Sequence, residues 1–178
     1  MPHWLARQHW YLGVEVPVFR PVGAFRLEDP DGEVGIETQL MTDGNEIYQI
    51  PMTYRSAALA KGALIATAEH SVLGTRWIYD GTTDPVWEAE LLRLVQAGGP
   101  GGSSGRGGIQ DVEVHGELLV PGIVLTAETA AIELSRVLRP GGLPRGQRVA
   151  GVVMGSWHPG GQAGAVTGCL AVVRLRPA

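Results

Sequence analysis

Apolar and polar side chains alternate most clearly on either side of the pair Asp43-Gly44. The run 34–42 leads into this pair and the run 46–54 leads away from it, and both runs are rich in β-branched, aromatic and aliphatic residues. Because glycine supplies the positive φ angle that a tight turn needs, the pattern predicts a β-hairpin. Pro51 in the second arm has no N–H to donate, which favours an edge position or a bulge there.

The remaining pattern up to residue 97 predicts more strands and two helices. Asp84 can cap a helix, Pro85 suits its first position, apolar residues recur along one face and Gly98 follows its end. These elements predict an α+β fold, with a curved antiparallel sheet packed against one or two helices. A short helix is expected over 4–11, and strands over 25–28, 64–70 and 76–79.

The C-terminal part, residues 109–178, is predicted to be β-rich, with turns at its Pro-Gly pairs. The stretch 127–131 fits either a helix or a strand. Strands are expected over 112–120, 123–126, 130–138, 149–157 and 165–175.

A run rich in glycine and serine divides the chain. Residues 98–108 contain nothing that can be buried to offset the entropy of ordering them, so they are predicted to form a flexible linker. The predicted organisation is therefore a first domain over 1–97, a linker over 98–108 and a β-rich segment over 109–178.

Composition narrows the function classes. The 178 residues are 44% hydrophobic with a formal net charge of −4, which fits a folded globular protein and argues against a nucleic-acid partner. Cys169 is the only cysteine, so no disulfide can form within the chain, and its apolar neighbours predict a small buried side chain. The sequence has neither a signal peptide nor an apolar run long enough to span a membrane, so we expect a cytoplasmic protein.

The sequence predicts no catalytic, cofactor-binding or metal-binding residues. The five histidines are scattered, and no two lie three or four positions apart as zinc ligands on a helix would. The glycine-rich run has no Walker lysine beside it. Residues 101–105 match the Gly-x-Ser-x-Gly pattern of a nucleophile elbow, but without the strand and helix that would hold Ser103 in a strained turn.

Acidic and aromatic residues leave two possibilities open. Paired carboxylates can act in glycoside hydrolysis at any spacing in the sequence, and Glu33, Glu37, Asp80 and Asp84 are the candidates. The aromatic residues either anchor the core or present a surface for a sugar or a protein. The candidate partner or sugar surface consists of Trp10, Tyr11, Tyr48, Tyr54, Trp77, Tyr79, Asp80 and Asp84.

Three motifs resemble the N-terminal cap of actinobacterial maltokinases: RQHWYLG at 7–13, TDGNEIYQIPMTYR at 42–55 and IYDGTTDP at 78–85. The whole chain is also similar to short, kinase-less proteins with a maltokinase N-terminal cap-like domain. The resemblance implies a cystatin-like fold, with a curved antiparallel sheet around a helix. It also implies a cap that rests on a kinase phosphorylating maltose, in trehalose and α-glucan metabolism, without contributing catalytic residues.

The chain departs from a kinase after the linker. A kinase needs a strand lysine and two aspartates for phosphate and metal binding. Residues 109–178 contain no lysine, and Asp111 is the last aspartate. We therefore expect a non-catalytic accessory or regulatory protein with a protein partner in this metabolism. The alternatives are a carbohydrate-binding module that uses exposed aromatics and a small enzyme with an unrecognised carboxylate site.

Overall fold

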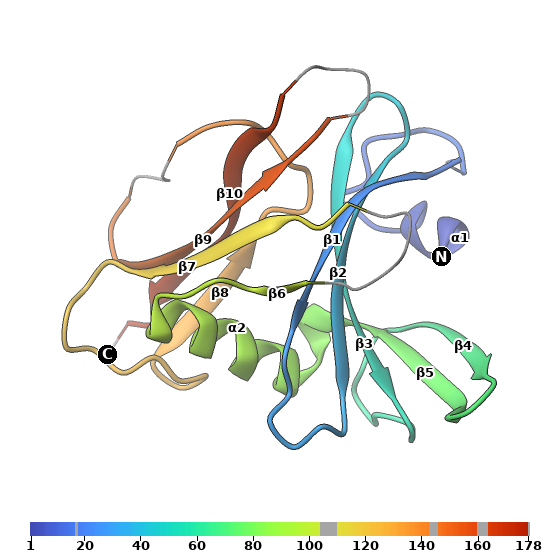
Figure 1. Cartoon of the computed structure of the whole chain (residues 1–178), viewed down its shortest axis with the longest axis horizontal. Coiled ribbons are helices and arrows are strands. Elements are labelled where there is room, and N and C mark those ends of the chain that lie inside the picture. The colour runs from blue at the N-terminus through green and yellow to red at the C-terminus, as the bar shows by residue number, and fades with distance from the viewer. Residues whose placement is uncertain (17, 104–109, 143–145, 160–163, 178) are drawn as a thin grey trace.

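The computed structural model describes residues 1–16, 18–103, 110–142, 146–159 and 164–177, and it shows two antiparallel sheets with a helix packed against them (Figure 1). The first sheet has the order β4-β5-β3-β2-β1-β6 and the second has the order β7-β9-β10-β8. This confirms the predicted α+β fold with a β-rich C-terminal segment. The strands of the first sheet are β1 (Arg20–Leu27), β2 (Gly35–Thr42), β3 (Ile47–Arg55), β4 (Leu64–His70), β5 (Gly74–Asp80) and β6 (Gly102–Ser103). Those of the second are β7 (Glu113–Leu118), β8 (Ala130–Leu134), β9 (Val149–Trp157) and β10 (Val166–Leu175).

The predicted hairpin around Asp43-Gly44 is confirmed as β2 and β3. Gly44 has a φ of 102°, and the Asp43 carboxylate accepts hydrogen bonds from the N–H groups of the two residues that follow the glycine. Pro51 is not on an edge strand, because β5 pairs with the end of β3. That pairing begins at Met52, so the register gives Pro51 a partner only in β2, where Thr38 lies opposite.

The second helix also agrees with its predicted signals. Helix α2 (Pro85–Ala97) is capped by Asp84 at its start and ends at Gly98, whose φ of 61° lies in the left-handed region. A short 3-10 turn, η1 (Gly81–Thr83), precedes it. The first helix is shorter than the predicted 4–11, because α1 covers only Pro2–Leu5. The chain then turns so that the rings beyond it, Trp10 and Tyr11, pack against Tyr48.

The prediction of a strand over 123–126 is wrong. The backbone groups of this stretch bond to the side chain of Gln96 in α2 instead of to a neighbouring strand. Leu125 N–H donates to the Gln96 amide oxygen at 2.8 Å, and the Gln96 amide nitrogen donates to Ile123 C=O at 3.1 Å. Residues 127–129, which fitted either a helix or a strand, form a turn that leads into β8. The predicted strand 130–138 is regular only to Leu134.

Backbone hydrogen bonds join the two sheets at both sides, so that strands from both halves of the chain form a closed ring. On one side, Ala24 in β1 donates to Gln110 C=O at 3.0 Å and accepts from Val112 N–H at 2.9 Å. On the other side, Gln49 N–H in β3 donates to Arg136 C=O, and Leu138 N–H donates to Ile47 C=O. The ring follows the order β1-β2-β3-β8-β10-β9-β7 and returns to β1.

Part of the predicted linker belongs to this structure. Gly102 and Ser103 form β6, which pairs with Arg26 and Phe25 of β1, because glycine leaves room for the backbones to meet. Residues 104–108 of the predicted 98–108 linker lie outside the described residues. One hydrophobic core fills the ring, and it contains side chains from both halves of the chain, among them Phe25, Leu40, Trp87, Val153 and Trp157.

Candidate functional site

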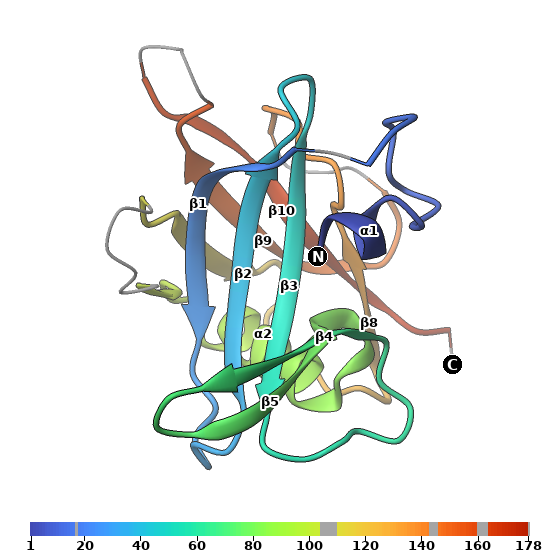
Figure 2. The same cartoon turned by 90° about the vertical axis from the view of Figure 1, so that its right-hand side faces the viewer.

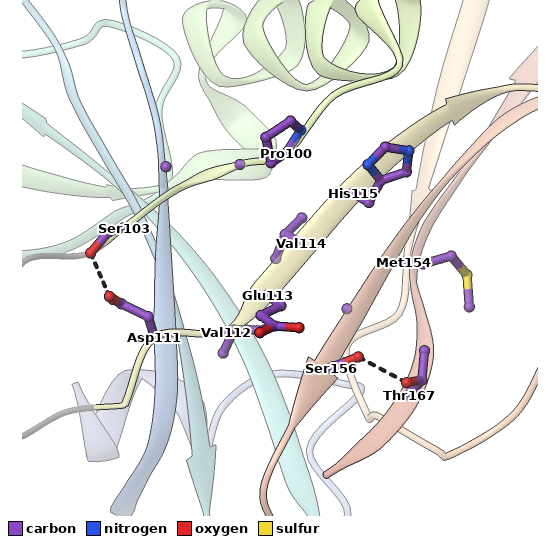
Figure 3. Close-up of a pocket in the computed structure, with 13 residues that line it drawn as sticks. Pro100, Ser103, Asp111, Val112, Glu113, Val114, His115, Met154, Ser156 and Thr167 are labelled. Atoms are coloured by element: carbon purple, nitrogen blue, oxygen red, sulfur yellow. Dashed lines mark hydrogen bonds between the residues drawn. The ribbon is translucent and has the colours of Figure 1, made fainter.

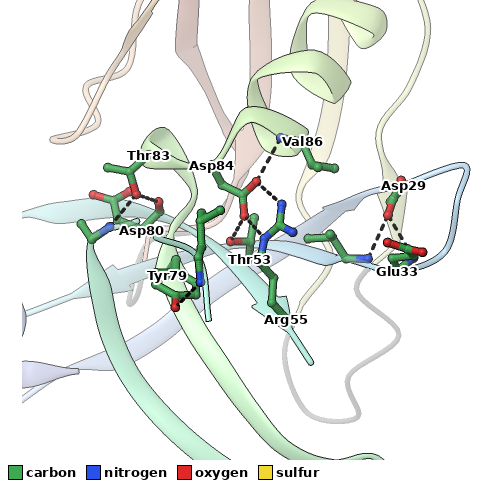
Figure 4. A network of polar contacts seen from close by, with 12 residues as sticks. Asp29, Glu33, Thr53, Arg55, Tyr79, Asp80, Thr83, Asp84 and Val86 are labelled. Atoms are coloured by element: carbon green, nitrogen blue, oxygen red, sulfur yellow. Dashed lines mark hydrogen bonds and ion pairs between the residues drawn. The ribbon is translucent and has the colours of Figure 1, made fainter. Parts of the chain in front are cut away.

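Asp84, a predicted site residue, lies at the junction of β3 and α2 (Figure 4). Its buried carboxylate accepts from Thr53 Oγ1 at 2.7 Å, from Arg55 Nε at 2.7 Å and Nη2 at 2.6 Å, and from Val86 N–H at 3.0 Å. Burial alone would raise the pKa of the Asp84 carboxyl, but these hydrogen bonds and the Arg55 charge outweigh it and lower the pKa below its ordinary value. Asp84 therefore joins two elements and has every oxygen engaged.

Asp80 has a similar role at the end of β5. Its carboxylate accepts from the backbone N–H of Thr82 at 3.1 Å and from the Thr82 hydroxyl at 3.0 Å, and it pairs with Arg136 Nη2 at 2.5 Å. Arg136 belongs to the C-terminal segment, so this ion pair fastens the two halves of the chain together. Asp80 thus caps the turn η1 and Asp84 caps α2, and each carboxylate is also paired with an arginine.

The aromatic residues near the N-terminus surround Tyr48. The Tyr48 ring is fully buried, with ring centroids of Trp10 at 6.3 Å, Tyr11 at 5.3 Å and Phe19 at 5.9 Å. Burial is the main cause that raises the pKa of Tyr48 to about 12, and the nearby Asp43 carboxylate adds to it. Three of the predicted surface aromatics, Trp10, Tyr11 and Tyr48, therefore pack together as a second, outer core.

The other predicted aromatic residues are on β3 and β5. Tyr79 is buried, and its hydroxyl accepts from Leu59 N–H at 2.8 Å. Trp77 and Tyr54 are half-buried. Because side chains alternate along β5, Trp77 points away from the face shared by Arg76 and Ile78. Tyr54 lines a groove, and it is the one residue of the predicted partner or sugar surface among the lining residues of that groove.

This groove lies between the outer face of the first sheet and the β4–β5 hairpin, which crosses in front of the lower ends of β1 and β2 in Figure 2. One part has a volume of about 510 Å³, and an adjoining part of about 420 Å³ shares Tyr54, His70 and Arg76 with it. We call the two parts together the outer groove. Its polar side chains are Arg26, Glu33, Glu37, Gln39, Tyr54, Glu69, His70 and Arg76.

Buried polar groups form the floor of the outer groove. Glu37 is only 1% exposed, and its carboxylate accepts from the Gln39 amide at 2.7 Å. Arg26 lies opposite Glu37 in the register of β1 and β2, with Nη2 3.8 Å from a carboxylate oxygen. Of the four acids considered for a paired-carboxylate site, Glu33 and Glu37 line one groove, whereas Asp80 and Asp84 do not.

A second hollow, of about 580 Å³, lies beside β6 and β7 (Figure 3). There the hydroxyl of Ser103 donates to the carboxylate of Asp111, and the hydroxyls of Ser156 and Thr167 lie 2.8 Å apart. Figure 3 places His115 on the far side of Val114 from Ser103. Ser103, the serine of the elbow-like pattern, is therefore hydrogen-bonded to the Asp111 carboxylate and lies away from His115.

The comparison with known families gives a match within the N-terminal half. Residues 4–84, just under half of the chain, match the model of the maltokinase N-terminal cap domain. The chain therefore carries a maltokinase cap-like domain. A comparison with curated proteins found no match.

The matched range contains the rings of the outer core and all the lining residues of the outer groove except Met1, and its last residue is Asp84. Helix α2 and the second sheet lie beyond the match, although they share the main core with β1 and β2. Within the described residues, no group of three or more His, Cys, Asp or Glu side chains could hold a metal ion. No helix in the described part of the chain is both long and apolar enough to cross a membrane.

Sequence reasoning missed part of the cap-like domain's groove. Arg26, Gln39 and Arg76 come from three different strands, and they share a face only because of the strand register. The available signal was that Glu37 and Gln39 lie two positions apart on a strand whose other face carries Ile36 and Leu40. Arg136 was missed as well, since its partner Asp80 is 56 residues away.

Proposed function

We propose that the chain is a non-catalytic accessory or regulatory protein linked to maltose, trehalose or α-glucan metabolism. The observation that carries the proposal is the family match over residues 4–84. The composition of the C-terminal segment supports the non-catalytic role, since it has no lysine and its last aspartate, Asp111, hydrogen-bonds Ser103. Kinase chemistry would need those residue types to hold phosphates and metal ions.

The architecture supports the same proposal. In this chain the residues after the cap-like domain close a ring with β1 and β3 and fill a shared core. The residues after the cap-like domain thus pack with it as part of one fold. We propose that this fold binds a protein partner from the same metabolism through its surface.

Exposed apolar side chains favour the cap-like domain as the docking surface. In the segment between α1 and β1, Val14 is fully exposed and Val18 is 87% exposed, and Leu12 and Val16 are also exposed. These four residues fall within one seven-residue stretch of the sequence, and grouped exposed apolar residues mark interaction sites more often than scattered ones. Val124, 69% exposed, lies outside the cap-like domain and serves as a matched control.

The test uses the purified full chain and the maltokinase and other trehalose and α-glucan enzymes of the same organism. Mass photometry is expected to show a complex with one of them, which weakens in the double variant Val14→Ser/Val18→Ser and persists in Val124→Ser. A chain that stays alone with every enzyme contradicts the proposal. Transfer of phosphate from ATP to maltose by the chain alone would contradict its non-catalytic part.

A further inference from the structure

The outer groove has a floor and a roof. Its floor is the outer face of β1, β2 and β3, opposite the face that packs into the main core. Its roof is the β4–β5 hairpin, which contributes His70 and Arg76. Met1, just before α1, lines the adjoining part. The two parts have volumes within the range of about 300–1,000 Å³ that is typical of small-molecule sites.

Charge is balanced in the larger part of the groove. Two guanidinium groups, of Arg26 and Arg76, and two carboxylates, of Glu33 and Glu37, line it together. The remaining carboxylate, of Glu69 in the adjoining part, accepts from the Thr75 hydroxyl at 2.6 Å. A balanced set of strong donors and acceptors suits an uncharged ligand with many hydroxyl groups better than it suits an ion.

The polar floor is held in place before any ligand arrives. Glu37 is almost completely buried, and its hydrogen bond from Gln39 fixes one carboxylate oxygen. Arg26 is across the ladder from Glu37, so strand pairing sets their separation. Groups fixed in this way lose little entropy when a ligand binds, which favours specific recognition.

An aromatic ring lies beside these polar groups. Tyr54 is half-buried in the groove wall, and its partner across the ladder is Gly35, which has no side chain to cover the ring. A methyl group at Gly35 would lie 3.5 Å from Tyr54 Cβ, in ordinary contact. The apolar face of a sugar ring can therefore pack against Tyr54 while its hydroxyls reach the floor.

We propose that the outer groove binds a neutral mono- or disaccharide, with Glu37 and Arg26 as hydroxyl partners and Tyr54 as the packing surface. The choice of maltose and trehalose as the sugars to test rests on the proposed function. The groove itself is inferred from its lining and charge. Sugar binding would give the accessory protein a way to respond to the metabolites of its partner enzymes.

The test is a titration of the ¹⁵N-labelled full chain with maltose, trehalose and glucose, with inorganic phosphate as the charged comparison. A sugar is expected to shift the amide resonances of Tyr54, His70 and Arg76. Glu37→Gln is expected to weaken its affinity by about tenfold or more, because one charge-assisted contact is lost. Tyr54→Ala is expected to weaken it by a similar factor, because the packing surface for the sugar ring is lost. Trp77→Leu, on the opposite face of the hairpin, is expected to leave the affinity unchanged.

Gly35→Leu is a further variant that keeps Glu37 and fills the space beside Tyr54, and it is expected to weaken the affinity as well. Melting temperatures identify any variant that fails to fold. No response to any sugar at tens of millimolar, shifts away from the groove, or tighter binding of phosphate would overturn the proposal. Enzyme capture in the earlier experiment does not depend on the groove, so each proposal can fail while the other stands.

Discussion

At the scale of single residues, Asp84 does three things with one carboxylate. It caps α2, accepts the Thr53 hydroxyl and pairs with both nitrogens of the Arg55 fork. The carboxylate is fully buried, whereas the Arg55 side chain keeps 21% of its surface exposed. Removing the carboxylate therefore leaves the partly buried Arg55 guanidinium without its partner. It also leaves the Val86 N–H at the start of α2 without its capping acceptor.

We expect Asp84→Ala to lower the free energy of unfolding by about 3–5 kcal/mol, because it breaks a buried, hydrogen-bonded pair and a helix cap together. Asp31→Ala removes an exposed aspartate and is expected to change it by less than about 0.5 kcal/mol. Urea denaturation followed by circular dichroism measures both variants. Equal effects of the two substitutions would show that the Asp84 network does not support the fold.

The lowered pKa of Asp84 predicts a loss of stability in acid. A carboxyl whose pKa is lower in the folded state than in the unfolded state, where it is about 3.9, stabilises the fold above that value. The contribution is lost as pH falls through the folded pKa. Asp84→Asn keeps the capping oxygen without the charge, so its deficit relative to the natural chain is expected to shrink as pH falls from 6 to 2. A deficit that stays constant over this range would contradict the assignment.

The capping role of Asp84 was predictable, because Asp-Pro before an apolar stripe is a local signal. Its partner Arg55 was not, since it lies 29 residues away and is brought near by the pairing of β3 with β5. Glu37 was predicted only as one of four candidates for a paired-carboxylate site. Its burial beside Gln39 depends on how the β4–β5 hairpin folds over β2, which no local pattern specifies.

At the scale of elements, α2 packs on strands that present glycine to it. A Cβ atom at Gly116 in β7 would lie 2.5 Å from Leu94 C=O, and one at Gly151 in β9 would lie 2.3 Å from a methyl carbon of Val95. The two glycines therefore let the helix backbone approach the second sheet closely. This contact joins the end of α2 to the C-terminal half of the chain.

Gly116→Ala is expected to destabilise the protein by about 1–3 kcal/mol, because the added methyl must push the backbone of α2 away from β7. Gly99→Ala is the matched control, since a Cβ atom there meets no described atom within 4 Å. Thermal unfolding of both variants measures the difference. A Gly116→Ala protein as stable as Gly99→Ala would mean that the helix does not pack this closely.

Elements with strong local signals were predicted well. The β2–β3 hairpin and α2 both carry turn or capping residues at their ends, and the two bounds of β9 were predicted correctly. The strand expected over 123–126 failed for a physical reason. Ile123 and Leu125 alternate as in a strand, but Gln96 satisfies their backbone groups, and this competing partner lies 27 residues or more away.

At the scale of the whole molecule, the two halves on either side of the glycine-rich run close one ring. Its closing bonds join Ala24 to residues 110 and 112, and Ile47 to Leu138. Arg136 adds the ion pair with Asp80, and its guanidinium lies 4.7 Å from the centre of the Trp10 ring. Such long-range pairing leaves no trace in local composition, which is why the sequence did not indicate it.

A ring with a shared core predicts that both halves unfold together. Trp87 belongs to the first half and Trp157 to the second, and both are buried in the same core. In protein labelled with 5-fluorotryptophan, their ¹⁹F signals are expected to lose native intensity at the same urea concentration.

Leu138→Ala, in the second half, tests this coupling directly. The truncation of a buried leucine is expected to cost about 2–5 kcal/mol and to lower the midpoints of both tryptophans equally. If the two halves were independent, Trp157 alone would respond, and Trp87 would keep the midpoint of the natural chain. Equal shifts would show that the C-terminal segment and the cap-like domain unfold as one cooperative unit.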